Sequence, residues 1–373
     1  MTPRSAPNEN KSLSYKPQLD GLRFIAVFGV LFYHYNSWIN TLDIPFTIDM
    51  GTFISFFFVL SSYLITSILL TNKHKGETMG HTAYNFLVRR TLRIFPAYYF
   101  YLLLLLALPY GGHDVKAHPL TYFLYLSNFR TYVSQTWDNL TSHLWTLAVE
   151  EQFYIVWLWV ILLIPDKYLP KVFYAIIGGG VLFRLLFFLL HPGAKTETVP
   201  LVILTPSCMD SFAFGGLLAY QQYYKKTNIP LLKKIFFIAL PIWIVLILTR
   251  QRLVLISLDR VVAAIGTMIL INGATRGRGY TNRFGAFLQH PWVTYLGKIS
   301  YGIYLYHLFL PYVFWKVYNG YIGYKPLTYV LVNPVVSFVW YFIMTVAFAS
   351  VSWYVLEKPI SELKRYFNYG ASR

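Results

Sequence analysis

Long apolar segments recur along almost the whole 373-residue chain and leave little room for a water-soluble core. Hydrophobic residues make up 56% of the sequence and charged residues only 13%. A membrane-spanning helix needs about 20 predominantly apolar residues, and ten segments approach or reach that length. The sequence therefore predicts an all-α, polytopic membrane helix bundle with about ten transmembrane helices. The predicted spans lie near residues 22–38, 52–71, 94–109, 152–165, 172–190, 207–223, 235–249, 258–274, 299–318 and 328–356.

The basic residues indicate which ends of these spans share a side of the membrane. The formal net charge is +17, and with ten spans 22 of the 32 Lys and Arg residues fall on the face that contains both termini. Cytoplasmic loops are enriched in Lys and Arg, so both termini are predicted to be cytoplasmic, and the charge needs no nucleic-acid partner. The apolar run 118–129 is too short for an ordinary span. It fits a re-entrant or interfacial piece, or an eleventh span that would upset the parity.

The ends of the chain divide it into three predicted parts. Residues 1–18 are polar, contain three prolines and lack the order of a cleavable signal peptide, so we expect a disordered cytoplasmic tail. Residues 19–357 form the predicted membrane domain, and residues 358–373 a second cytoplasmic tail. The single cysteine, Cys208, excludes an internal disulfide and a cysteine-rich metal site, and no metal is expected.

Arg23 and His34 are the residues able to carry charge near pH 7 within the first predicted span. They are eleven positions apart, so a helix places both on one face, about 16 Å apart along its axis. An ionisable residue inside a membrane helix is by default a functional hypothesis. Histidine both takes and gives protons near pH 7, which suits a general base. The alternative for His34 is a core histidine bonded to a neighbouring carbonyl.

Two carboxylates follow in the segment SHLWTLAVEEQFY, which we place at the outer mouth of the next span. Glu150 and Tyr154 are four residues apart and share a helix face, with Trp145 roughly one turn before the glutamate. A carboxylate beside His34 would fix its tautomer, as the acid does in a catalytic triad. Alternatively, Glu150 and Glu151 are solvated charges at a helix N-terminus, where they favour the helix dipole.

Further charges lie at or within other predicted spans. Arg90 and Arg93 are three residues apart, just before the span 94–109, and guanidinium groups suit phosphate recognition. Arginines at this face also serve as ordinary membrane anchors. Arg184 and Asp210 are intramembrane charges that either pair or line a cavity.

Hydroxyl and aromatic side chains add two weaker signals. Ser61 and Ser62 lie mid-span, where helix packing is the expected role. Tyr301, Tyr304 and His307 share one flank of a helix and are expected to line a pocket, the alternative being interfacial aromatics.

Six segments in this order resemble the acyltransferase-3 family of integral membrane acyltransferases, many of which O-acetylate cell-surface polysaccharides. They span nearly the whole chain. The segments are LDGLRFIAVFGVLFYHY, FFFVLSSYLIT, RRTLRIFPAYY, HLWTLAVEEQFY, SYGIYLYHLFL and the closing EKPI. Ser62 departs from the family, whose members carry glycine in the LSGFLIT-like motif.

The resemblance implies roles for single residues. It makes His34 the catalytic histidine, assigns Arg90 and Arg93 to binding of the acyl-CoA donor, and maps the family glutamate best onto Glu150, with Glu151 possible. Arg23 is expected to bind the donor or stabilise charge along its path.

The expected function is transfer of an acetyl or other short acyl group from cytoplasmic acyl-CoA to a hydroxyl of a glycan or glycoside, in a bacterial plasma membrane and in contact with lipid. The chain lacks the SGNH-type hydrolase domain that some members carry after the membrane part, so the membrane domain is expected to complete the transfer. The competing prediction is an exporter or flippase of a glycan or lipid-linked sugar, with the same charges along a path. A non-catalytic scaffold would leave the intramembrane histidine and arginine unexplained.

Overall fold

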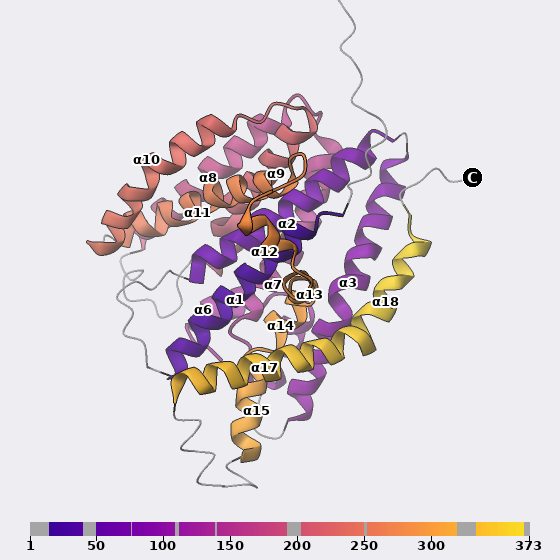
Figure 1. Cartoon of the computed structure of the whole chain (residues 1–373), viewed down its shortest axis with the longest axis vertical. Coiled ribbons are helices and arrows are strands. Elements are labelled where there is room, and N and C mark those ends of the chain that lie inside the picture. The colour runs from indigo at the N-terminus through magenta and orange to yellow at the C-terminus, as the bar shows by residue number, and fades with distance from the viewer. Residues whose placement is uncertain are drawn as a thin grey trace, which may run out of the picture.

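The computed structural model is built from α-helices that pack into one bundle (Figure 1). It describes residues 15–39, 50–75, 77–108, 112–138, 140–191, 203–249, 252–318 and 333–368. Most of the predicted disordered tail, residues 1–14, lies outside these ranges, and the first helix already begins at Pro17. Proline is common at this first helical position because its missing N–H would have no helical partner there.

Each of the ten predicted spans overlaps a helix or a broken pair of helices, while residue 109 and residues 328–332 of these predictions lie outside the described residues. The first half of the bundle contains α1 (Pro17–Ile39), α2 (Met50–Lys73), α3 (Met79–Ala107), α4 (His113–Ala117), α5 (Pro119–Phe123), α6 (Ser127–Ser134), α7 (Leu144–Leu163) and α8 (Leu169–Leu190). The second half contains α9 (Thr205–Tyr223), α10 (Ile229–Leu248), α11 (Arg252–Thr275), α12 (Arg283–Gln289), α13 (Pro291–Lys298), α14 (Ser300–Tyr306), α15 (Phe309–Val317) and α17 (Pro334–Ser352). The chain then continues through a π-helical turn, η4 (Trp353–Glu357), into α18 (Lys358–Glu362) and a 3₁₀ turn, η5 (Leu363–Tyr366).

Six helices of the described part are long and apolar enough to cross a membrane. They are Gly51–Lys73, Leu144–Leu163, Leu169–Leu190, Ile229–Leu246, Leu258–Thr275 and Pro334–Tyr366. Four predicted spans are not among these six: α1 contains Asp20 and Arg23, α3 contains three arginines, α9 contains Asp210 and several other polar residues, and the span 299–318 is broken between α14 and α15.

Several predicted boundaries change, and two of them matter most for the site and the C-terminal end. The helix expected over 94–109 begins at Met79, capped by the Thr78 hydroxyl, which accepts a hydrogen bond from the His81 amide at 3.3 Å. Arg90 and Arg93 therefore lie in the middle of α3, and Pro96 lies inside it instead of in its first turn. The segment after residue 357 was expected to be a tail, but it stays helical to Tyr366.

The segment 118–129 forms the short helix α5 and the start of α6, which are five and eight residues long. These helices are too short to cross a bilayer, so the described residues contain no eleventh span here. Tyrosines of α3 hold this segment through its backbone: Tyr98 donates to the Tyr122 carbonyl at 2.8 Å, and Tyr99 donates to the Phe123 carbonyl at 3.0 Å. Each of these hydrogen bonds pairs a tyrosine hydroxyl with a backbone carbonyl, so both polar groups are satisfied away from water.

Helices α2 and α9 approach each other closely. A Cβ atom added at Gly215 would lie 2.1 Å from the Val59 carbonyl oxygen and 3.0 Å from Cβ of Ser62. Ser62 is fully buried at this contact, which confirms the packing role predicted for it. Figure 1 shows α8, α9, α10 and α11 gathered on one side of α2, with α3 and α18 side by side on the other. The space between α1, α2, α3, α7 and α14 holds the candidate site.

Candidate active site

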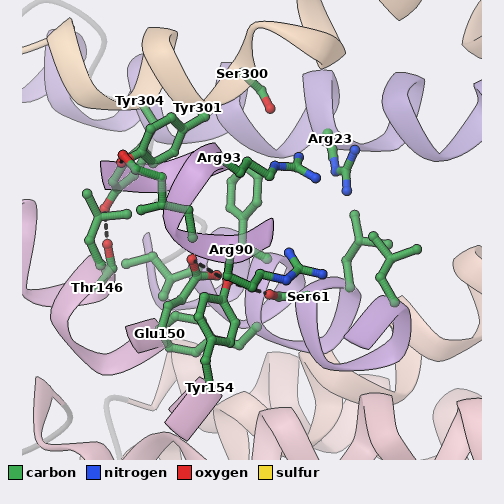
Figure 2. Close-up of a pocket in the computed structure, with 17 residues that line it drawn as sticks. Arg23, Ser61, Arg90, Arg93, Thr146, Glu150, Tyr154, Ser300, Tyr301 and Tyr304 are labelled. Carbon is green, nitrogen blue, oxygen red and sulfur yellow. Dashed lines mark hydrogen bonds between the residues drawn. The ribbon is translucent and has the colours of Figure 1, made fainter. Parts of the chain in front are cut away.

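An internal pocket lies where α1, α2, α3, α7 and α14 meet (Figure 2). Its empty volume is about 840 Å³, a figure that includes the open mouth. Three arginines, one glutamate, three tyrosines, three hydroxyl residues and an apolar wall line it. The lining residues are Arg23, Ile54, Phe57, Phe58, Leu60, Ser61, Leu64, Arg90, Arg93, Ile94, Thr146, Leu147, Glu150, Tyr154, Ser300, Tyr301 and Tyr304.

The three arginines gather at one end of the pocket, while Thr146 and Tyr304 lie at the other (Figure 2). Arg23 is paired with Asp20, one helical turn away, at 2.8 Å. Arg90 and Arg93 make no hydrogen bond or ion pair within the described part of the chain; Arg90 lies over the Tyr154 ring, 5.6 Å from its centroid. A guanidinium group inside a protein is costly without a partner. This end of the pocket is therefore suited to an anionic ligand.

Glu150 lies in the same pocket and belongs to a short hydrogen-bonded chain. Tyr154 donates to Glu150 Oε2 at 3.1 Å, and the Tyr154 hydroxyl is 2.9 Å from Ser61 Oγ. Glu150 also interacts electrostatically with all three pocket arginines. Glu150 and Tyr154 are helical neighbours, as the spacing predicted, and both face the pocket. Ser61, which was expected to serve helix packing, also lines the pocket.

The expected contact between Glu150 and His34 does not occur among the described residues. Helix α7 begins at Leu144, so Glu150 lies almost two turns inside the helix and not at its mouth. Its side chain is turned toward α2 and α3, where Ser61 and the arginines are. The helical spacing placed Glu150 beside Tyr154 correctly, but it carried no information on which neighbouring helix that face meets.

His34 instead lies against another histidine. His34 Nδ1 is 3.0 Å from Nε2 of His307 and 3.2 Å from the Val30 carbonyl oxygen. The two ring centroids are 4.8 Å apart. A third imidazole, that of His143, has its centroid 5.1 Å from that of His307. Among the described residues no group of three His, Cys, Asp or Glu side chains is arranged to hold a metal ion.

Tyr304 connects the histidines to the pocket. Its ring lines the pocket and lies 5.6 Å, centroid to centroid, from the rings of both His143 and His307. Its hydroxyl is 2.6 Å from Thr146 Oγ1 and donates to the His143 carbonyl at 3.1 Å. His34, His143 and His307 do not line the pocket themselves; Tyr304 separates its end from the rings of His143 and His307, and the arginines lie at the opposite end.

The remaining predicted site residues divide between pocket and core. Of the three residues expected on one pocket-lining flank, Tyr301 and Tyr304 line the pocket and His307 does not; Tyr154 lines it as well. Trp145 is buried in the core around α7, and Glu151 lies outside the pocket wall.

Arg184 and Asp210 form a fully buried ion pair at 2.6 Å between α8 and α9, which decides between the two alternatives for these charges in favour of pairing.

Sequence reasoning missed several pocket residues. Thr146 and Ser300 line the pocket, and both are common polar residues whose positions gave no signal on their own. The same holds for Asp20, which pairs with Arg23 beside the pocket. His143, two helical turns before Glu150, was given no role, although it is 2% exposed and donates from Nε2 to the Leu305 carbonyl at 3.0 Å. A spacing of three residues between His143 and Thr146 was the one available hint that both share a helix face.

The fold and the site thus define a class of protein. It is a helical membrane protein with a cationic internal pocket that ends beside buried histidines. The chain belongs to the acyltransferase 3 family: the family's acyltransferase domain matches residues 16–354. This match covers every residue of the pocket and the histidine cluster.

The chain is also similar to characterised and putative O-acetyltransferases. It is 29% identical over 324 residues to the peptidoglycan O-acetyltransferase OatA of Listeria monocytogenes, an alignment that covers 79% of this chain and 49% of the relative. It is 33% identical over 172 residues to the O-acetyltransferase OatA of Staphylococcus aureus, covering 42% of this chain and 26% of the relative. It is 38% identical over 158 residues to the putative peptidoglycan O-acetyltransferase YrhL of Bacillus subtilis, covering 38% of this chain and 23% of the relative.

The chain therefore spans about half the length of these relatives, or less. No solved structure matches it.

Proposed function

We propose that the protein transfers an acetyl or other short acyl group from acyl-CoA to a hydroxyl of an extracytoplasmic glycan, with peptidoglycan as the favoured acceptor. One observation carries the proposal: the pocket has Arg90 and Arg93 at one end, without hydrogen-bond or ion-pair partners among the described residues, and Tyr304 at the other. The Tyr304 ring lies 5.6 Å from the ring of His307, which is the hydrogen-bonded neighbour of His34. Family membership supplies the reaction type, and the names of the relatives supply the acceptor class.

The arginine end of the pocket fits the phosphates of acyl-CoA. Arg90 and Arg93 offer guanidinium forks without competing partners among the described residues, and phosphate oxygens accept such bidentate hydrogen bonds. Arg23 is already paired with Asp20, so its contribution is the smaller of the three. Because basic residues accumulate on the cytoplasmic side of membrane proteins, this end is assigned to the cytoplasm, where acyl-CoA is available.

The distance along α1 fits the donor. Arg23 and His34 are eleven residues apart, about 16 Å along a helix axis, and a thin pantetheine arm spans such a length. The apolar wall of α2, with Phe57, Phe58 and Leu60, would accompany this arm. The thioester would then arrive beside Tyr304 and the histidines.

His34 is the proposed reacting residue. It acts either as the general base on the acceptor hydroxyl or as the nucleophile that first accepts the acyl group. Glu150 is assigned to the donor end, where its charge balances the arginines before the donor binds, and not to orienting His34. Both termini and the bulk of the basic loops are placed in the cytoplasm of a bacterial cell.

The test uses purified protein in lipid nanodiscs, acetyl-CoA with a radiolabelled acetyl group, and soluble peptidoglycan fragments. We expect the label to appear as an ester on the glycan. An exporter or flippase would leave the label on CoA, which would contradict the proposal.

His34→Ala should abolish transfer, whereas His118→Ala should not, because His118 is exposed in the outer segment away from the pocket. Wild-type turnover by folded His34→Ala protein would contradict the assignment of His34.

A further inference from the structure

The protonation of His307 follows from its hydrogen bonds. Its Nδ1 atom is 2.5 Å from the Tyr304 carbonyl oxygen. A carbonyl oxygen only accepts hydrogen bonds, so the proton of a neutral His307 is on Nδ1. Its Nε2 atom then carries the lone pair and is an acceptor.

The same reasoning fixes the tautomer of His34. His34 Nδ1 faces two acceptors, the Val30 carbonyl at 3.2 Å and Nε2 of His307 at 3.0 Å. The proton of a neutral His34 is therefore on Nδ1, and its lone pair is on Nε2. Nε2 is the atom that would remove a proton from a hydroxyl or attack a thioester.

We infer that His307 is a positioning residue for His34: it accepts the Nδ1 proton and so holds the reactive lone pair on Nε2. A carboxylate has this task in a Ser-His-Asp triad, and sequence reasoning gave it to Glu150. The inference rests on the proposed function, in which His34 is the reacting residue.

The surroundings hold His307 rigidly. Helix α14 ends at Tyr306 and α15 begins at Phe309, so His307 lies in the interruption between them. Its side chain is fully buried, and its carbonyl accepts a hydrogen bond from the Tyr35 hydroxyl at 3.0 Å. An ordered acceptor in an interrupted membrane helix is a pre-organised support, and such interruptions are tolerated where neighbours satisfy the backbone.

The transfer step balances with this arrangement. Nε2 of His34 removes the proton of the acceptor hydroxyl while the hydroxyl oxygen attacks the thioester carbonyl carbon. The carbon–sulfur bond breaks, and the proton passes from Nε2 to the departing thiolate, which leaves an ester and free CoA. During the step His34 carries a positive charge, and the hydrogen bond from its Nδ1 to His307 Nε2 stabilises that charge. His307 can do this only while neutral, because two charged imidazoles 3.0 Å apart repel each other.

Two substitutions separate this role from a packing role. His307→Phe keeps a buried ring but removes the acceptor. His307→Gln keeps an acceptor, because its amide oxygen reaches about as far as imidazole Nε2. His143→Gln is the matched control, since His143 belongs to the same cluster but His307 is the imidazole hydrogen-bonded to His34.

The first measurement is the rate of transfer from radiolabelled acetyl-CoA by nanodisc-embedded protein. We expect His307→Phe to lower kcat by about 100-fold with an unchanged KM for acetyl-CoA, in line with loss of acid–base assistance. His307→Gln should keep kcat within about tenfold of wild type, since a neutral acceptor remains. A kcat for His307→Phe close to wild type, or an equal loss in both variants, would overturn the inference.

The second measurement is the ¹⁵N NMR spectrum of histidine-labelled protein, which distinguishes Nδ1–H from Nε2–H tautomers without turnover. We expect His34 to be the Nδ1–H tautomer in wild type, His307→Gln and His143→Gln, and to gain Nε2–H character in His307→Phe. An Nε2–H tautomer in wild type would refute the inference. If His34→Ala retained transfer, the proposed function of His34 would fail; if it were inactive while His307→Phe stayed active, the inference about His307 alone would fail.

Discussion

Binding of acyl-CoA should depend on Arg90 and Arg93 and hardly at all on Arg89, although all three lie on the same stretch of α3. Arg90 and Arg93 line the pocket, whereas Arg89 donates to the Lys364 and Phe367 carbonyls at 2.8 and 3.0 Å and so ties α3 to the C-terminal segment. Arg89→Ala is therefore the matched control.

The expected loss of affinity follows from the hydrogen bonds to phosphate that each alanine variant would lack. A hydrogen bond to a charged group contributes about 1.5–3 kcal/mol, and about 1.4 kcal/mol corresponds to a tenfold change in affinity. Arg90→Ala and Arg93→Ala should therefore each raise the Kd for acetyl-CoA by roughly 10- to 150-fold. The double variant should lose less than the product of the two, because Arg90 and Arg93 repel each other and removing one relieves the other.

The assay is isothermal titration of acetyl-CoA into nanodisc-embedded protein, with thermal unfolding of each variant measured alongside. Arg89→Ala is expected to keep the Kd within about twofold of wild type. It should lower the unfolding temperature, since it loses two hydrogen bonds from the Arg89 side chain to backbone carbonyls. Equal Kd values for wild type and Arg90→Ala/Arg93→Ala protein would refute the donor site. An effect of Arg89→Ala as large as theirs would show that the loss reflects the stability of α3 and not phosphate binding.

Three further predictions concern stability, each measured by thermal unfolding in detergent. Asp210→Asn leaves the fully buried Arg184 without its 2.6 Å partner and should cost about 3–5 kcal/mol; a cost below about 1 kcal/mol would contradict a desolvated ion pair. Gly215→Ala should also destabilise, because its Cβ would lie 2.1 Å from a backbone oxygen of α2, and an unchanged unfolding temperature would disprove that close approach. Asp166, in the loop after α7, should stabilise the fold at neutral pH, and this stabilisation should be lost on acidification. The difference in unfolding temperature between wild type and Asp166→Asn should therefore become smaller below about pH 4. A difference in unfolding temperature that does not change with pH would argue against the ion pair of Asp166.

The sign of the Asp166 effect follows from its environment. Burial opposes its ionisation, but hydrogen bonds from Lys73 and Tyr224 and the charges of Lys73 and His74 outweigh burial and lower the pKa of the carboxyl group. A carboxylate whose pKa is lower in the folded than in the unfolded state stabilises the fold above the unfolded pKa. That stabilisation disappears as the pH falls through the folded pKa. Lys73 Nζ lies 2.8 Å from Asp166 Oδ1.

Apolar length predicted where the helices are, because a membrane helix must satisfy its own backbone and needs a nearly continuous apolar run. Apolar length predicted the first and last residues of a helix less well where charged residues lie within the helix. Helix α3 begins 15 residues before the expected start, since Arg90 and Arg93, which were predicted to precede the span, lie inside the helix and face the pocket. A hydropathy pattern cannot separate a charge at the membrane surface from a charge in a cavity.

The candidate site was predictable within helices and not between them. Helical spacing placed Glu150 with Tyr154, and Arg90 near Arg93, because neighbours three or four residues apart share a face. It could not show that His307, 273 residues away from His34, is its hydrogen-bonded neighbour, because that contact depends on how α1 packs against the interruption after α14. Glu150 was therefore given the place that we infer for His307.

The claim that His34 directs acyl transfer to a surface glycan is tested most directly by mass spectrometry of peptidoglycan fragments. The fragments come from cells that lack the protein and are complemented with wild type, His34→Ala or His118→Ala, each at matched membrane abundance. We predict O-acyl esters on the glycan with wild type and His118→Ala, and none with His34→Ala. Esters at wild-type level in cells with His34→Ala protein would contradict the account.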